Sequence, residues 1–526
     1  MFSCYHCKDA KFYVNSNLLM SWKIVILIAY FCSFGWLNNG QFLSKYDDLI
    51  FFAGLVILLS FSNVISRSEL AKLSLIGLSV IVLYFVFTSN PYLDQKVYKM
   101  ISTLNLERAN LLNDNTTKSY YKKIQNEIDQ SFTSNQNISF SMTIEIDRIL
   151  SKTEMMASRI INYAMHQNSN SMLYSSINFG NDFYQNLKLS FFAILLPFSF
   201  SLIVLKLKLI KPTFWALTAS TGLLVLLGLY YRFQYLQGNA LEGREILGLW
   251  QAPEPRISFA SFTYKNHWSA YVILVLSVCL CLFFQILKTK VLPFFRCNKS
   301  VSLLVFTIIS VLSVFYSSSN SGLIFVFLFL LSSIVLFLLK KISLKFITPF
   351  VLISIVLASL SLTKSMFIDR VKDLLSGDSF RLNLWSDIIN QIQLKTFWGY
   401  GLDSYKTING IFQSTEITSA RVQNLQGAHQ QYIPITIHAH TDFLQILSEI
   451  GFIGTSLIIF PIIFGVVSWI FTKPSTKSNL TAIALNIILL YSITDFPFRN
   501  IAVSSMFVFL LCINALSQKH KRGLYL

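Results

Sequence analysis

The sequence predicts an all-α polytopic membrane protein, and three features of its composition support that fold class. Of its 526 residues, 53% are apolar and only 13% are charged, about half the roughly 25% of charged residues that soluble proteins carry. The mean hydropathy is +0.55. The apolar residues also gather in stretches of roughly 20, the length that crosses a bilayer. These features exclude a soluble enzyme, a disordered chain and a small disulfide-rich secreted domain.

About twelve such stretches predict the transmembrane helices, each near the roughly 20 residues that a span needs. The long outer loop that follows the ninth stretch leads into the tenth. In chain order the stretches are 21–37, 49–66, 71–89, 187–206, 213–231, 266–287, 300–318, 320–339, 343–363, 443–471, 479–496 and 500–517.

The basic residues of the loops predict the topology. Lys and Arg collect in every second short loop, as they do on the cytoplasmic side of membrane proteins, and we therefore expect both termini in the cytoplasm. The net charge of +18 is explained by these loops, and it does not indicate a nucleic-acid partner. The loops carry Arg67 and Lys72, then Lys206, Lys208 and Lys211, then Lys288, Lys290, Arg296 and Lys299, then Lys340, Lys341 and Lys345, then Lys473 and Lys477, and finally Lys519, Lys521 and Arg522.

This topology divides the chain into membrane units and extracytoplasmic segments. The segment after the third helix is polar, and its parts 117–131 and 143–166 have helical spacing, which predicts a small helical extracytoplasmic domain. The predicted units are 1–89 with three helices, 90–186 as the extracytoplasmic insertion, 187–363 with helices four to nine and an outer loop at 232–265, 364–440 as a long extracytoplasmic catalytic loop, and 441–526 with the last three helices and a basic cytoplasmic tail.

The densest group of polar residues lies where the loop 364–440 enters the tenth helix. His438 and His440 precede that helix, and Asp442 and Glu449 are two turns apart on one helical face. Histidine titrates near neutral pH and is the commonest general base for activating a hydroxyl. Alternatively, both histidines are loop residues that cap the helix. A zinc site that also includes His429 lacks a defined ligand spacing.

Two arginines on the predicted outer side accompany these histidines. Arg381 lies early in the loop 364–440, and Arg256 precedes the sixth helix. A guanidinium group grips phosphate bidentately, so these arginines favour an anionic lipid headgroup; the alternative is that each anchors a helix end at the membrane interface. We find no Walker loop, GxSxG or metal-binding Asp pair. Any donor must therefore arrive already activated.

Several motifs in this order resemble the O-antigen ligase and polymerase family, bacterial membrane glycosyltransferases that use undecaprenyl-pyrophosphate-linked sugars. The resemblance covers roughly residues 210–515, and two positions depart from the family pattern, Thr441 and Asn320. The motifs are His440 followed, after Thr441 and nine residues, by Gly451, Gly454 and Thr455; Arg381 with Trp385; Gly399-Tyr400-Gly401; Phe262 with Asn266-His267; and Asp495-Phe496-Pro497-Phe498-Arg499.

The resemblance implies transfer of a glycan from undecaprenyl pyrophosphate to an acceptor hydroxyl at the periplasmic face of a bacterial inner membrane. His440 is then the general base, and Arg381 and Arg256 hold the donor pyrophosphate. The reaction inverts the sugar configuration and uses no metal and no cofactor. The partners are the lipid-linked donor, membrane lipids and a lipid A core, glycan or protein acceptor. The implied substrate-binding residues are His438, Lys265, Asn266, His267, Trp385, Tyr400, Asp442, Glu449 and Arg499.

Other functions share this scaffold. Within the family, the ending Gly451-xx-Gly454-Thr455 favours a ligase, but polymerisation of repeat units and transfer to protein Ser or Thr are alternatives. A transporter of lipid-linked glycans would share the helices and a basic outer cavity. It would be expected to carry charges in mid-membrane and an internal repeat, and the sequence shows neither. A non-catalytic scaffold would leave the histidines and arginines unexplained.

Overall fold

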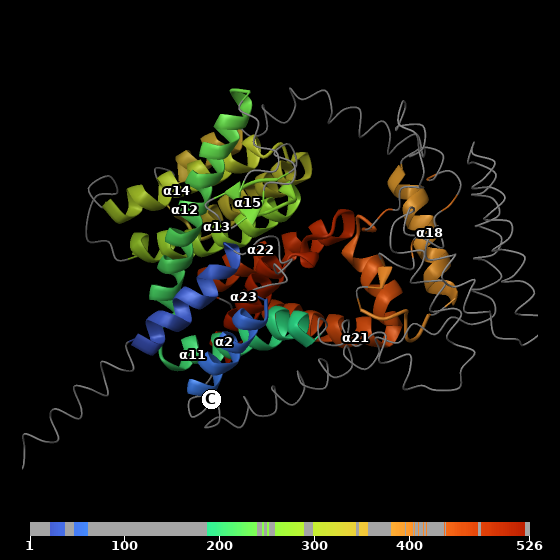
Figure 1. The fold of residues 1–526 in the computed structure, drawn as a ribbon. Coiled ribbons are helices and arrows are strands. Elements are labelled where there is room, and N and C mark those ends of the chain that lie inside the picture. Colours follow the sequence, from blue (N-terminus) through green and yellow to red (C-terminus); the bar gives the residue numbers. More distant parts are fainter. Residues whose placement is uncertain are drawn as a thin grey trace, which may run out of the picture.

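The computed structural model confirms a helical polytopic membrane protein (Figure 1). It describes residues 22–36, 47–61, 187–238, 245–246, 250–251, 258–288, 298–342, 347–355, 380–394, 396–402, 404–405, 409, 414, 417, 436, 438–471 and 475–520. The predicted third span 71–89, the insertion 90–186 and Arg256 lie outside the described residues, as does most of the loop 364–440.

The described elements are, in order, η1 (Ser33–Gly35), α2 (Asp47–Ser60), η2 (Phe191–Leu195), α11 (Leu196–Lys206), α12 (Ile210–Leu236), β1 (Glu245–Ile246), β2 (Trp250–Gln251), α13 (Lys265–Lys288), α14 (Asn298–Tyr316), α15 (Asn320–Leu339), α18 (Phe380–Leu394), α21 (Asp442–Phe471), α22 (Thr476–Thr494), η4 (Pro497–Arg499) and α23 (Ile501–His520).

Most of the predicted spans coincide with helices of the structure. Seven described helices are long and apolar enough to cross a membrane, and three shorter apolar helices lie at Trp22–Gly35, Ile50–Ser60 and Ile501–Leu516. Residues 347–355 are helical within the predicted span 343–363. The total of twelve spans and the cytoplasmic termini stay predictions, because 71–89 and both chain ends lie outside the described residues.

The structure differs from the prediction in the outer loop 232–265 and in the tenth helix. α12 continues to Leu236, and β1 and β2 form a short antiparallel pair within that loop. The tenth helix was expected to be continuous over 443–471, but α21 contains a non-helical residue at Gly451.

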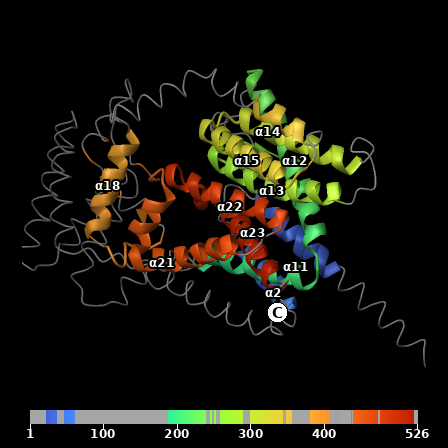
Figure 2. The same ribbon diagram turned by 180° about the vertical axis from the view of Figure 1, so that it is seen from behind.

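α13 is the central helix of the bundle, with α12, α14, α15, α22 and α23 packed around it (Figures 1 and 2). Its residues from Trp268 to Phe284 are buried. Two of its buried polar side chains bond within the protein: Ser277 Oγ donates to Leu274 O at 2.7 Å, and Trp268 Nε1 donates to Ser313 Oγ at 3.0 Å. Polar groups within a membrane need such partners because hydrocarbon offers none.

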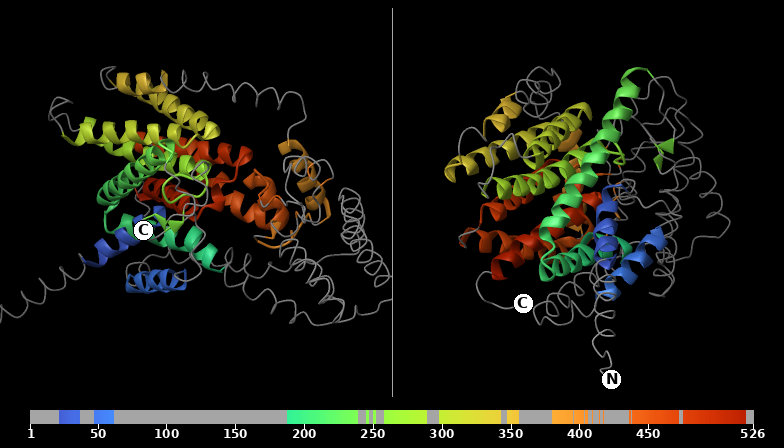
Figure 3. Two further views of the ribbon diagram at one scale, coloured as in Figure 1. Left: turned by 45° about the horizontal axis from the view of Figure 1, so that its top comes forward. Right: turned by 90° about the vertical axis from the view of Figure 1, so that its left-hand side faces the viewer.

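The outer helices of the bundle present apolar side chains on their exposed faces. In a soluble protein such faces would be an aggregation hazard, whereas in a bilayer they contact lipid. Figure 3 shows the two N-terminal helical segments beside α11 and α12, where Trp36 Nε1 donates to Ser220 Oγ at 2.9 Å. The exposed apolar residues include Leu223, Leu226, Tyr230 and Phe233 of α12 and Leu328, Leu331, Val335 and Leu338 of α15.

Candidate active site

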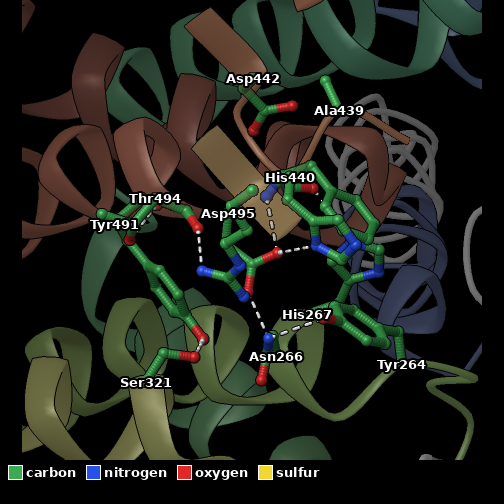
Figure 4. A network of polar contacts seen from close by, with 12 residues as sticks. Tyr264, Asn266, His267, Ser321, Ala439, His440, Asp442, Tyr491, Thr494 and Asp495 are labelled. Atoms are coloured by element: carbon green, nitrogen blue, oxygen red, sulfur yellow. Dashed lines mark hydrogen bonds and ion pairs between the residues drawn. The ribbon is translucent and has the colours of Figure 1, made fainter. Parts of the chain in front are cut away.

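Four stretches of the chain meet at the candidate active site (Figure 4). They are the beginning of α13, the turn between α22 and η4, the residues before α21, and the beginning of α18. Asn266 of α13 donates to the carboxylate of Asp495, and the backbone N of Asp442 donates to Asp495 O at 3.1 Å. Arg381 of α18 donates from Nη1 to Thr494 O at 2.9 Å. Hydrogen bonds therefore join all four stretches at Thr494 and Asp495.

The carboxylate of Asp495 lies beside the His440 imidazole. His440 Nδ1 is 3.9 Å from Asp495 Oδ1, and the side chains are 26% and 2% exposed, respectively. Oδ1 also accepts from the backbone N of Phe496 at 3.0 Å, while Oδ2 accepts from Asn266. The histidine is thus open to a substrate, whereas the carboxylate behind it is enclosed.

The backbone around His440 is held in an unusual conformation. His440 has a φ of 53°, in the left-handed region that non-glycine residues adopt mainly at special sites. The preceding residue is fixed on both sides, because Trp385 Nε1 donates to Ala439 O at 3.2 Å and Ala439 N donates to Gln445 Oε1 at 3.1 Å. These bonds fix the backbone next to His440 and thereby orient its side chain.

Four rings surround Phe496. His438 stacks on it with ring centroids 4.4 Å apart, and Tyr264 stacks at 5.0 Å. His267 and His440 meet it edge to face, at 5.0 and 5.2 Å. His267 Nε2 also lies 3.0 Å from Phe496 O. The three histidines therefore all pack against one aromatic side chain, Phe496, from the turn after α22.

Arg381 lies at the carbonyl end of α22. Its bond to Thr494 O satisfies one of the carbonyls that a helix leaves unpaired at its C-terminus. A guanidinium group has five N–H donors in a planar fork, so this bond fixes the side chain without exhausting its capacity to bind an anion. Arg381 therefore lies within the site, because the residue that it bonds, Thr494, immediately precedes Asp495.

Asp442, Glu449 and Arg499 form a largely buried group of charged side chains where α21 begins and η4 ends. Arg499 Nη2 is 2.8 Å from Glu449 Oε1, and its Nε is 3.9 Å from Asp442 Oδ1. Gln445 Nε2 also donates to Glu449 Oε1 at 3.1 Å, and Phe498 N donates to Asp442 Oδ2 at 2.8 Å. These contacts link α21 to η4. The predicted substrate contacts of the three charged residues stay predictions.

An Arg499→Ala substitution is expected to lower the free energy of unfolding by about 3–5 kcal/mol, because it leaves the buried Glu449 carboxylate without its cation. Glu449 is 0% exposed and Arg499 15% exposed, so water compensates little. Adding Glu449→Gln to this variant is expected to restore part of the loss, since an amide carries no charge. Thermal unfolding in detergent micelles measures both. Equal midpoints for Arg499→Ala and the native protein would contradict the expectation.

α21 is broken at Gly451, which has a φ of 65° and a ψ of −174°. The break exposes the carbonyls of Ser448 and Glu449, which in a continuous helix would accept from residues four positions later. Here Tyr400 N donates to Ser448 O at 3.1 Å and Gly401 N donates to Glu449 O at 2.6 Å. A turn from the preceding loop therefore enters the break in the helix.

The same turn, residues 396–401, also satisfies the helix beyond the break. Phe452 N donates to Thr396 O at 2.8 Å, and Ile453 N donates to Phe397 O at 3.1 Å. Backbone bonds to the turn thus replace the helical bonds lost at Gly451, as buried backbone groups require. We call this arrangement of the turn and the broken helix the interlock.

Tyr400 is fixed within the interlock rather than directed to solvent. Its side chain is fully buried, and its hydroxyl donates to Gln391 O at 3.3 Å. Gln391 Oε1 in turn accepts from Ser448 Oγ at 3.0 Å, and its Nε2 donates to Asn409 Oδ1 at 3.1 Å. α18 and α21 are therefore joined through buried amide and hydroxyl groups.

The remaining predicted residues are placed as follows. Lys265 begins α13, one residue before Asn266, so it lies at the edge of the site, while Arg256 lies outside the described residues. Within the described part of the chain, no group of three or more His, Cys, Asp or Glu side chains is arranged to hold a metal ion. His429, the third residue of the zinc alternative, is outside that part.

Asp495 belongs to one of the sequence motifs, but it is not among the predicted site residues. The signal was present, because an acidic residue at the end of an apolar stretch is costly and marks function. Ser319 and Gln445 were also missed. Serine and glutamine near helix ends are common, and only the fold brings these two to Asn266 and Ala439.

Fold and site together define a multi-pass membrane protein with a histidine–carboxylate pair and an arginine among its helix ends. A family model described as O-antigen ligase matches residues 305–459, under a third of the chain. The match supports an O-antigen ligase-like family of membrane glycosyltransferases, as the motifs indicate. Arg381 and His440 lie within the matched segment, whereas Asn266 and Asp495 lie outside it. A comparison with curated proteins gave no match.

Proposed function

We propose that the protein is a ligase-like glycosyltransferase that moves a glycan from undecaprenyl pyrophosphate to an acceptor hydroxyl. The reaction takes place at the periplasmic face of a bacterial inner membrane. The observation that carries the proposal is the accessible His440 imidazole, 3.9 Å from the enclosed Asp495 carboxylate, with Arg381 bound to the adjacent Thr494. A base, an orienting carboxylate and an anion-binding group are the parts that this transfer needs.

In the proposed reaction, the acceptor hydroxyl gives its proton to His440 while its oxygen bonds to the anomeric carbon of the donor sugar. The bond from that carbon to the pyrophosphate oxygen breaks at the same time, and undecaprenyl pyrophosphate leaves with the electron pair. Because attack and departure occur on opposite faces, the sugar configuration inverts. Nδ1 of His440 faces Asp495, which leaves Nε2 to accept the proton.

The pyrophosphate leaving group gains negative charge as the bond breaks. Arg381, together with Arg256, binds this group and offsets the charge through bidentate N–H donation. The bond from Arg381 to Thr494 O holds the guanidinium next to the turn that carries Asp495. Donor and base are thereby brought to the same place, so that the acceptor oxygen needs to move only a short way to react.

The lipid-linked glycan pool tests this function in cells where a His440→Ala variant replaces the native protein. Full-length glycans are expected to accumulate on undecaprenyl pyrophosphate, because a ligase uses finished chains. Accumulation of single repeat units would instead identify a polymerase, and loss of glycan from a protein acceptor would identify an oligosaccharyltransferase. An unchanged pool with unchanged surface glycan would contradict the proposal and favour a transporter or a scaffold.

A further inference from the structure

The side-chain amide of Asn266 is engaged by protein groups on both sides. Its Nδ2 donates to Asp495 Oδ2 and, at 2.9 Å, to the Tyr264 hydroxyl. Its Oδ1 accepts from Ser319 Oγ at 2.6 Å, and the residue is 5% exposed. An amide NH₂ group has two hydrogens, so both are in use. A substrate would have to displace a protein partner in order to receive a hydrogen bond from Asn266.

Ser319 fixes the direction of this amide. It is the N-cap of α15, and its Oγ accepts from Gly322 N at 3.1 Å. The hydroxyl has one hydrogen, and this hydrogen is directed to Asn266 Oδ1. The amide oxygen therefore points to Ser319, and the NH₂ group points to Asp495. The reverse orientation would place the amide oxygen against a carboxylate and the NH₂ group against a hydroxyl hydrogen.

This orientation helps to set how the Asp495 carboxylate is rotated. Asn266 holds Oδ2, Phe496 N donates to Oδ1 at 3.0 Å, and Oδ1 is the oxygen that faces His440 Nδ1. The Ser319 hydroxyl and the Asn266 amide each accept one hydrogen bond and donate another, and such connected bonds strengthen one another in a buried site. Figure 4 shows Asn266 beneath Asp495, with His440 beyond the carboxylate.

We infer that Ser319 and Asn266 are positioning residues that aim the Asp495 carboxylate at His440. The inference rests on the proposed function of His440 as the general base, and it replaces the substrate contact that the family resemblance implies for Asn266. The connection joins the turn between α14 and α15 to the turn after α22. Neither residue touches the donor or the acceptor. Their loss is therefore expected to slow the chemical step without weakening substrate binding.

The test measures glycan transfer by membranes that contain the native protein or one variant. The donor is the undecaprenyl-pyrophosphate-linked glycan extracted from cells carrying His440→Ala, and initial rates are recorded over a range of donor concentrations. Asn266→Ala is expected to lower kcat by about 10- to 100-fold, the range for loss of a hydrogen bond to a charged group, and Ser319→Ala by about 2- to 10-fold, the range for a hydrogen bond between neutral groups. The KM for the donor is expected to stay within about twofold of the native value, since a contact that does not touch substrate leaves binding unchanged.

Two further variants separate positioning from a general structural role. Ser319→Thr keeps both the hydroxyl and the cap, and it is expected to restore most of kcat. Ser321→Ala alters the same turn, where Ser321 Oγ lies 3.3 Å from the Tyr491 hydroxyl, and it is expected to leave kcat near the native value. Equal losses in Ser321→Ala and Ser319→Ala would overturn the inference, as would a failure of Ser319→Thr to exceed Ser319→Ala.

The outcomes also distinguish this inference from the proposed function. An active His440→Ala variant would overturn both. An inactive His440→Ala variant beside native kcat values in Asn266→Ala and Ser319→Ala would overturn the positioning role alone. A raised KM with unchanged kcat in Asn266→Ala would likewise overturn it, because that result marks a residue that binds the donor.

Discussion

A His440→Ala variant is expected to transfer glycan about 10²- to 10⁴-fold more slowly than the native protein, the usual contribution of a positioned general base. The physical reason is that the acceptor hydroxyl then has no group to take its proton as the new bond forms. Most of the loss is expected in kcat, because the donor pyrophosphate is held by arginines. Rates measured at saturating donor in membranes with matched protein levels check this.

A second variant controls for the backbone at this position. His440 has a φ of 53°, where alanine is strained but asparagine is tolerated. His440→Asn therefore keeps the local conformation while removing the imidazole, and it is expected to be as slow as His440→Ala. If His440→Asn transferred glycan at the native rate, the loss in His440→Ala would reflect backbone strain, and His440 would not be the base.

A Gly451→Ala variant is expected to lose at least about 3 kcal/mol of stability, from left-handed backbone strain and broken hydrogen bonds. An added Cβ would lie 2.3 Å from Phe397 O, which is backbone, and Gly451 has a φ of 65°. The interlock would therefore have to open. Its bonds from Tyr400 and Gly401 to the broken helix would lengthen or be lost. Thermal unfolding in detergent and the yield of folded protein measure the effect.

Gly399→Ala is expected to behave in the same way, because its Cβ would lie 2.5 Å from the backbone of Glu449. The matched control is Gly222→Ala in α12, whose Cβ would lie 3.5 Å from a ring carbon of Phe306, an ordinary contact. That variant is expected to unfold at or above the native temperature. If Gly451→Ala unfolded at the same temperature as Gly222→Ala, the result would contradict the importance of the interlock.

The helices could be predicted from the sequence because their signal is local. A run such as 320–339 is mostly apolar and contains no charged residue, and α15 occupies the same residues. The break at Gly451 could not be predicted in this way. Glycine is common in membrane helices, and the bonds that stabilise the break come from residues 396–401, some 50 positions earlier in the chain.

The candidate site was predictable in part for a similar reason. His438, His440 and Asp442 are close in sequence, so their grouping needed no fold. Asp495 is more than 50 positions away from His440, and only the packing of α21 beside α22 brings its carboxylate to the imidazole. Long-range contacts of this kind follow from tertiary structure, which hydropathy does not encode.

The place of Asp495 in the chain has a consequence for how the protein is made. Segments of a growing chain are released in order from the N-terminus, so α13 emerges well before α22 and α23, which later enclose it. His440 and Arg381 also emerge before the final pair of helices. The carboxylate behind His440 arrives only with the turn between those helices. An incomplete chain in the membrane therefore has a histidine without its acidic partner, and under the proposed function such a chain is expected to be inactive until that turn has been inserted.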